Sequence, residues 1–443
     1  MHYIQSCKRL DSVSRSLSVW REQYAAFVAR NPNTPPLESP LERYSASELE
    51  SIALQRGSVD AGWRSTTEQS APMRNIPFKK ADSVQTCLID GGRWLLASAL
   101  CDVMVYDLDD PKDCGKVLIP RHADAPEKQQ TADLQVDVLV DAPTLAFNVA
   151  ISERRWPDAF VQFERLFENE NTPLRVHIWR VALEGHCANA QLQAVHLTSF
   201  TTARAVVYKI HDCVEVYDWS ASSIQEHRKA VLYAWCVHVH LLSHDRLLLF
   251  RNNRILLCGI PALEACCLPS SRPLGSNMTP YNSISLPGTR FVRGGPSQLR
   301  FNLSTGCTFM SVTDAGIFVV GLSETTSYAH LFHAIENPKN VTDVVLGARK
   351  VYIRSYRFAT AFSYEAEHTL VGASTMGYHT TPLQKRSVPE KHFAYLGPKM
   401  DEISGRIVMA AYPSSLVVCY YSQYDEHRLF AGHRHIATAV CCD

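Results

Sequence analysis

The stretch Val214-Glu215-Val216-Tyr217-Asp218-Trp219 decides the fold, because its pattern recurs along the chain. The pattern runs aliphatic, any residue, aliphatic, aromatic, polar, apolar. Alternating apolar positions are typical of a β-strand that buries one face. Close copies are Val103–Leu108 and Val176–Val181, and looser ones are Ile255–Ile260, Ile317–Leu322, Val351–Tyr356 and Leu416–Tyr421. We therefore expect these segments to be equivalent strands.

A second strand and a polar turn precede each good copy, as in Arg93–Ser98 and Arg246–Phe250. Such pairs predict hairpins. Repeats of about forty residues with several strands and no helix are the signature of a β-propeller, because one blade cannot bury both faces alone. The sequence from residue 81 to 443 therefore predicts a mainly β fold, a β-propeller of about seven blades. Val214–Trp219 resembles the outgoing strand of a WD repeat, so we call the blades WD-like.

A short α-helical segment precedes the β-rich part. Apolar residues keep helical spacing up to Trp20. Four prolines between Asn31 and Pro40 then interrupt it, and Ser45 with Glu48 forms a capping box for a short helix that we expect to end at Gly57. The predicted organisation is 1–30 helices, 31–80 a linker with one short helix, and 81–443 the propeller-like domain.

Composition narrows the classes of partner. The chain of 443 residues has 44 basic and 44 acidic side chains, so its net charge gives no general attraction to nucleic acid or to anionic membranes. We expect neither as a partner. The N-terminus does not read as a signal peptide, and no apolar run is long enough for a membrane span. Fourteen cysteines without a Cys-x-x-Cys pair are interpreted as buried small hydrophobes in a reducing compartment, cytoplasmic or nuclear.

The sequence contains no recognisable catalytic motif, since the usual nucleophile, phosphate-loop and zinc-protease motifs are missing. His238 and His240, with His244-Asp245 nearby, are the best metal candidates, but we interpret them as structural. The acidic pair Asp109-Asp110 is interpreted as turn charges. We expect no catalytic residue, metal or cofactor.

The acidic pair Asp401-Glu402 precedes a predicted hairpin entry. We expect Gly405 to adopt a positive φ there and Arg406 to pair with the two acidic side chains.

The head of the chain carries a resemblance. Cys7-Lys8-Arg9-Leu10 followed by Val19-Trp20-Arg21 resembles the closing half of an F-box. The run from Pro36 to Ser65 is similar to the segment that follows the F-box in mushroom-type fungal F-box proteins. The resemblance implies a substrate-receptor subunit of a cullin-RING ubiquitin ligase, with the adaptor bound through Cys7, Leu10, Leu17 and Trp20 and a target protein held by the propeller.

Two further interpretations stay open at this point. The first half of the F-box is missing upstream of Met1, so either the start codon is misassigned or ligase coupling has been lost. In the second case the propeller is an interaction scaffold without ligase activity. A third possibility is an enzyme with a site in the propeller channel. The sequence does not identify the target protein or the face that binds it.

Overall fold

The computed structural model contains two described α-helices near the N-terminus, followed by thirty β-strands. The helices are α2 (Leu17–Arg30) and α3 (Ala46–Arg64), with the 3-10 turn η1 (Leu41–Arg43) between them. The structure describes these elements and many of the turns that join them. The longer stretches outside the description are residues 1–12, 65–72, 121–129, 156–174, 219–226, 267–275, 289–299, 367–377, 388–397 and 421–443. No described helix is long and apolar enough to cross a membrane.

The strands form seven sheets, numbered here by chain order. The first sheet has β2 (Gln85–Leu88), β3 (Trp94–Ala99), β4 (Asp102–Asp107) and β5 (Lys116–Ile119). The second has β6 (Gln130–Val138), β7 (Ala146–Arg155), β8 (Arg175–Ala182) and β9 (Gly185–Gln193). The third has β10 (Leu197–Phe200), β11 (Ala205–Ile210), β12 (Cys213–Tyr217) and β13 (His227–Tyr233), with β17 (Glu264–Cys266) and β18 (Ser276–Asn277) added at β13.

The later sheets follow the same plan. The fourth has β14 (His238–Leu241), β15 (Arg246–Arg251), β16 (Arg254–Gly259) and β19 (Pro280–Ser285). The fifth has β20 (Arg300–Asn302), β21 (Gly306–Thr313), β22 (Gly316–Ser323) and β23 (Ser327–Ala334). The sixth has β24 (Val341–Leu346), β25 (Lys350–Ser355), β26 (Phe358–Ala366) and β27 (Tyr378–Ser387).

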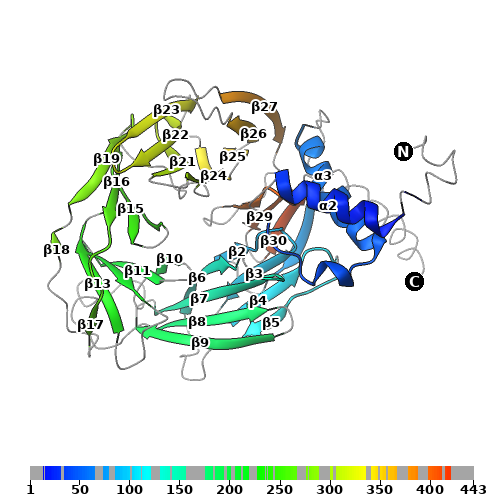
Figure 1. Cartoon of the computed structure of the whole chain (residues 1–443), viewed down its shortest axis with the longest axis horizontal. Coiled ribbons are helices and arrows are strands. Elements are labelled where there is room, and N and C mark those ends of the chain that lie inside the picture. The colour runs from blue at the N-terminus through cyan, green and yellow to red at the C-terminus, as the bar shows by residue number, and fades with distance from the viewer. Residues whose placement is uncertain are drawn as a thin grey trace.

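The last sheet, called the closing sheet here, joins the two ends of the β-rich region. It has β28 (Lys399–Asp401), β29 (Arg406–Ala411) and β30 (Ser415–Tyr420), and β1 (Met73–Pro77) pairs with β30. The sheets follow one another around a ring, with the helices on its outside (Figure 1). This arrangement confirms the mainly β propeller fold with a short helical segment at its N-terminus, but not the expected number of blades.

The repeated sequence pattern marks one strand in each sheet. Six of the copies lie in the third strand of their sheet when strands are counted from β2, β6, β10, β14, β20 or β28, and Val351–Tyr356 lies in a second strand, β25. Tyr106, Trp179 and Tyr217 therefore occupy equivalent third strands, as predicted. Val105 and Val216 are buried, with exposed fractions of 7% and 0%. The side chain of Ile178 lies outside the description.

The expectation of about seven blades is wrong, because the structure shows five blades arranged as in a regular propeller. In a regular propeller, consecutive sheets meet along their innermost strands. Here the first strands of only five sheets, β28, β2, β6, β10 and β14, run side by side in this way. In the described part of the chain, β20 and β24 lack comparable contact with a neighbouring first strand, and β20 has only three residues. The fifth and sixth sheets are held to their neighbours by side-chain packing.

Apolar side chains fill the spaces between neighbouring sheets. Leu95 and Ala97 of the first sheet pack against Val418 of the closing sheet. Similar clusters join the first sheet to the second, the third to the fourth, and each later sheet to the next. Because each blade buries its faces only against its neighbours, the ring stabilises them together.

Two boundaries differ from the sequence-based expectation. β1 lies inside the stretch 31–80, so the sheet structure begins before residue 81. The helix expected to end at Gly57 continues to Arg64 as α3. Its continuation carries Val59 into the apolar cluster between the sixth and closing sheets, and this burial outweighs the weak helix propensity of glycine. The capping box is confirmed: the Ser45 backbone N–H donates to the Glu48 carboxylate at 2.8 Å.

We predict that Val216→Ala lowers the free energy of unfolding by about 2 kcal/mol, because it leaves a cavity in a fully buried site. The matched control is Val117→Ala, the same chemical change at a side chain that is 52% exposed. Denaturant unfolding of both variants measures the difference. Equal stability of the two variants would contradict the packing described here.

Candidate functional site

The candidate site is the helical head, α2 and α3, together with its attachment to the propeller. The two helices pack against each other. The Arg56 guanidinium on α3 lies 5.5 Å from the ring centroid of Tyr24 and 5.8 Å from that of Phe27, both on α2. Arg56 Nη1 also donates to Tyr24 Oη at 3.3 Å. Cation–π contacts of this kind hold the helix pair together.

The residues predicted to bind an adaptor are only partly described. Leu17 is the first residue of α2, and Trp20 follows three positions later, so the two share one side of the helix. Both are half-buried. Cys7 and Leu10 lie outside the described residues, so the structure does not show whether the four side chains meet.

The head and the linker that joins its helices are attached to the ring by apolar packing and by hydrogen bonds. Val59 of α3 packs against Tyr352 and Ile407, which belong to the sixth and closing sheets. Leu49, near the start of α3, is fully buried. In the linker, the Leu37 carbonyl accepts a hydrogen bond from the Leu145 backbone N–H at 2.7 Å.

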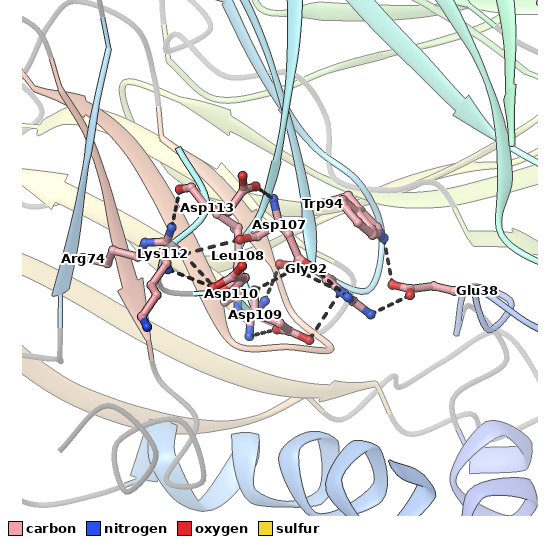
Figure 2. Close-up of polar contacts among 12 residues, drawn as sticks. Glu38, Arg74, Gly92, Trp94, Asp107, Leu108, Asp109, Asp110, Lys112 and Asp113 are labelled. Carbon is pink, nitrogen blue, oxygen red and sulfur yellow. Dashed lines mark hydrogen bonds and ion pairs between the residues drawn. The ribbon is translucent and has the colours of Figure 1, made fainter. Parts of the chain in front are cut away.

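A polar cluster, called the junction here, joins the linker to the first sheet (Figure 2). Glu38 accepts from Arg93 Nη1 at 2.6 Å and from Trp94 Nε1 at 2.7 Å. Arg93 also donates to both carboxylate oxygens of Asp107, at 3.0 and 2.7 Å. A bidentate arginine–carboxylate pair fixes geometry as well as charge. The linker is therefore held at a defined position on the first sheet.

Within the junction, burial raises the pKa of the carboxyl groups, and the nearby Arg93 lowers it. Burial raises the pKa of Glu38, although the Arg93 guanidinium and the Trp94 indole lower it. For Asp107, burial acts upward, but the hydrogen bonds and charge of Arg93 outweigh it and leave the pKa below its ordinary value. Arg93 therefore stabilises the ionised form of Asp107.

Arg406 of β29 links the closing sheet to the first sheet. It is 1% exposed, and its Nη2 lies 2.6 Å from a carboxylate oxygen of Asp109. Its Nη1 donates to the Gly92 carbonyl at 2.9 Å. Arg74 of β1 makes a parallel link, because its Nη2 donates to the Asp113 carbonyl at 2.8 Å. Both arginines thus reach from the closing sheet to turns of the first sheet, and Figure 2 shows Arg74 beside Asp113.

Arg406 therefore pairs with a different partner from the one predicted. The sequence interpretation placed it beside Asp401 and Glu402. Instead, Asp401 accepts backbone N–H groups of Gly91 and Ser404, at 3.1 and 2.7 Å. Glu402 accepts the Lys350 backbone N–H at 2.6 Å. The acidic pair is thus used by backbone donors, which leaves Arg406 directed to Asp109. The positive φ predicted for Gly405 is confirmed at 70°.

The interpretation of Asp109-Asp110 as turn charges holds for Asp110 but not for Asp109. Asp110 is exposed and accepts the Lys112 backbone N–H within its own turn at 2.9 Å. Asp109 is the ion-pair partner of Arg406. No local pattern distinguishes two adjacent aspartates. Only a charged residue distant in sequence does so.

Three carboxylates come together where the inner strands of three consecutive sheets end. Asp90 follows β2, Asp401 ends β28, and Asp137 lies near the end of β6. Burial, followed by the charges of Asp401 and Asp137, raises the pKa of Asp90 to about 7. The described residues contain no group of histidine, cysteine or acidic side chains placed to hold a metal ion.

His238 and His240 point to the same side of β14, as their spacing predicts. His238 packs edge-on against Phe250, with ring centroids 6.5 Å apart. Burial, followed by the charge of His238, lowers the pKa of His240 to about 4. The ring contact of His238 and the burial of His240 fit the structural interpretation. His244 lies outside the description.

An open groove of about 320 Å³ runs between the head and the second sheet. Tyr24 and Val28 of α2 form one wall, and Ala142 and Pro143 of the β6–β7 turn form the other. The linker residues 34–37 line it between them. Sequence reasoning did not find this groove, since its walls lie more than a hundred residues apart.

Solved structures resemble this chain only at low similarity. No model of a known protein family matches the sequence, and no curated protein matches it. A chain of the mitotic checkpoint complex is 10% identical, with a TM-score of 0.43, over 80% of this chain and 96% of that one. The C-terminal WD40 domain of Sif2 is 7% identical, with a TM-score of 0.40, over 79% and 99%. BamB from Moraxella catarrhalis is 9% identical, with a TM-score of 0.37, over 80% and 99%.

These scores are low, and the propeller assignment rests on the sheets described above.

We predict that Arg406→Met lowers the free energy of unfolding by about 3 kcal/mol, because it leaves the Gly92 carbonyl without this donor and Asp109 with only the longer ion pair to Arg93, at 3.7 Å. Arg251→Met, at an exposed arginine at the end of β15, is the matched control and is expected to change stability by less than about 0.5 kcal/mol. Chemical denaturation measures both. A small effect at Arg406 would show that this link contributes little.

We predict a pH dependence that originates from Asp90. Its pKa in the folded chain is about 7, against 3.8 ordinarily, so between these values the folded state holds a proton that the unfolded state has lost. This group therefore makes stability fall as pH rises through that window. Relative to the wild type, Asp90→Asn gains stability from pH 5 to pH 8, by at most about 1.4 kcal/mol per pH unit.

Unfolding curves across this pH range measure the gain. Asp110→Asn, at an exposed turn aspartate, is the control and is expected to follow the wild type. If Asp90→Asn also follows it, Asp90 is ionised at neutral pH in the folded chain.

Proposed function

We propose that this chain is a non-enzymatic substrate receptor of an F-box-type ubiquitin ligase. In this proposal the helical head binds the ligase adaptor and the propeller holds a target protein. The sequence resemblance at residues 7–21 and 36–65 motivates it. The observation that carries it is the placement of half-buried Leu17 and Trp20 on a helix pair that lies outside the ring (Figure 1).

The attachment of the head to the ring supports separate roles for the head in adaptor binding and for the propeller in target binding. A receptor must hold its target at a fixed position relative to the ligase, so its two binding parts need a stiff connection. The Glu38–Arg93–Asp107 contacts and the packing of Val59 supply such a connection. A flexible linker would lose the defined geometry.

One observation favours a second function, an interaction scaffold without ligase coupling. Leu49 and Val59 of α3 are almost fully buried, and Val59 belongs to the cluster between the sixth and closing sheets. On this alternative the head serves only to brace the ring, and no adaptor binds. The two functions differ in whether residues at the start of α2 contact another protein.

We predict that Leu17→Ala combined with Trp20→Ala abolishes binding of the purified ligase adaptor. An aromatic anchor and its aliphatic neighbour commonly contribute about 2 kcal/mol each at an interface, so a micromolar complex is lost with both. Glu22→Ala with Gln23→Ala, at exposed positions of the same helix, is the matched control and is expected to bind normally.

Circular dichroism and thermal unfolding confirm that the propeller stays folded in each variant. If the wild-type chain fails to bind the adaptor at micromolar concentration, ligase coupling is wrong and the scaffold function replaces it.

A further inference from the structure

The outer edge of the third sheet is unlike that of the other sheets, because the chain returns to it. After β16 of the fourth sheet, the chain pairs back onto β13 of the third sheet as β17 and β18, and only then completes the fourth sheet with β19. These two short strands lie on the outer rim of the ring (Figure 1). The edge of β13 therefore accepts an added strand.

Two short described strands cover this edge. β17 pairs antiparallel with residues 227–229 of β13, and β18 pairs in parallel with residues 232–233. In the described part of the chain, five of the seven residues of β13 are thus paired, by two pieces that run in opposite directions. One continuous strand would pair all seven residues in a single register.

The side chains along β13 give the edge a chemical preference. Arg228 is exposed at one end, and Tyr233 is 50% exposed at the other. Next to Arg228, Lys229 is buried, and its Nζ lies 3.5 Å from a carboxylate oxygen of Glu215 on the neighbouring strand β12. Glu264 of β17 stands in register with Lys229 and is exposed. The strand β17 thus carries a carboxylate at the end of the edge where Arg228 is exposed.

We propose that the outer edge of β13 is a strand-addition site for an extended segment of a target protein, which displaces β17 and β18. The segment runs antiparallel to β13. It carries an apolar side chain opposite Tyr233 and, five residues later, a carboxylate opposite Arg228. Main-chain hydrogen bonds supply affinity, and these two side chains supply specificity.

This inference rests on one part of the proposed function, the binding of a target protein by the propeller, and names the strand edge that binds it. It does not involve the helical head. Peptide binding to the edge is measured without any adaptor, so loss of the adaptor interaction and loss of strand addition are separate results.

The test uses the full chain and a fluorescent seven-residue peptide with phenylalanine first, glutamate sixth, and valine and threonine between. Ala265→Pro weakens β17, because proline has no N–H to donate to the ladder. This variant is expected to bind the peptide about tenfold more tightly than the wild type, since a larger fraction of molecules has an open edge. Ala262→Pro, at an exposed residue before β17, is the matched control and is expected to match the wild type.

Charge reversal tests the register. A peptide with lysine in the sixth position is expected to bind the Ala265→Pro chain about fivefold more weakly, and adding Arg228→Glu is expected to reverse the preference between the two peptides. Amide hydrogen exchange at residues 227–233 shows whether the edge opens. If Ala265→Pro does not fold, Glu264→Gly with Ala265→Gly weakens the same strand without proline.

Two outcomes overturn the proposal. One is an edge that exchanges faster in the weakened variant and yet binds no peptide at high micromolar concentration. The other is a weakened variant that forms dimers and binds no peptide, which would assign the edge to a second copy of this chain.

Discussion

The pairing of β1 with β30 is the constraint on which the ring depends. It joins a strand that begins at Met73 to one that ends at Tyr420, through five register pairs. A propeller blade is stable only between two neighbours, so without this closure the first and sixth sheets would each expose an apolar face. The arginines of the closing sheet, Arg74 and Arg406, reinforce the joint by reaching turns of the first sheet.

Buried charged groups lie where the closing sheet meets the first sheet. Arg406 is almost fully buried, and a buried guanidinium destabilises the fold unless charge and hydrogen bonds satisfy it. Asp109 and the Gly92 carbonyl supply both. Near the same joint, burial and then the charges of Asp401 and Asp137 raise the pKa of Asp90 to about 7. The joint therefore combines a paired charge with a buried carboxyl group whose pKa lies near neutrality.

The two candidate binding surfaces lie on different parts of the molecule and use different physics. The head presents half-buried apolar side chains on a helix, where affinity comes from excluding water. The third sheet presents backbone donors and acceptors along β13, where affinity comes from ladder hydrogen bonds. Other exposed edges carry the same groups, but on β13 the chain itself shows that a strand fits.

Local patterns in the sequence were sufficient for most of the repeated strands, for the capping box at Ser45 and for the turn at Gly405, because each depends on residues a few positions apart. They were not sufficient for the number of blades. The adaptor-binding prediction at Leu17 and Trp20 also came from a local motif and stays a prediction. Tertiary structure alone decided that β1 closes the ring, that α3 passes Gly57 to bury Val59, and that Arg406 meets Asp109 rather than its acidic neighbours. Each of these outcomes depends on which distant surfaces are buried together, and a repeat pattern cannot encode that choice because every blade offers similar faces.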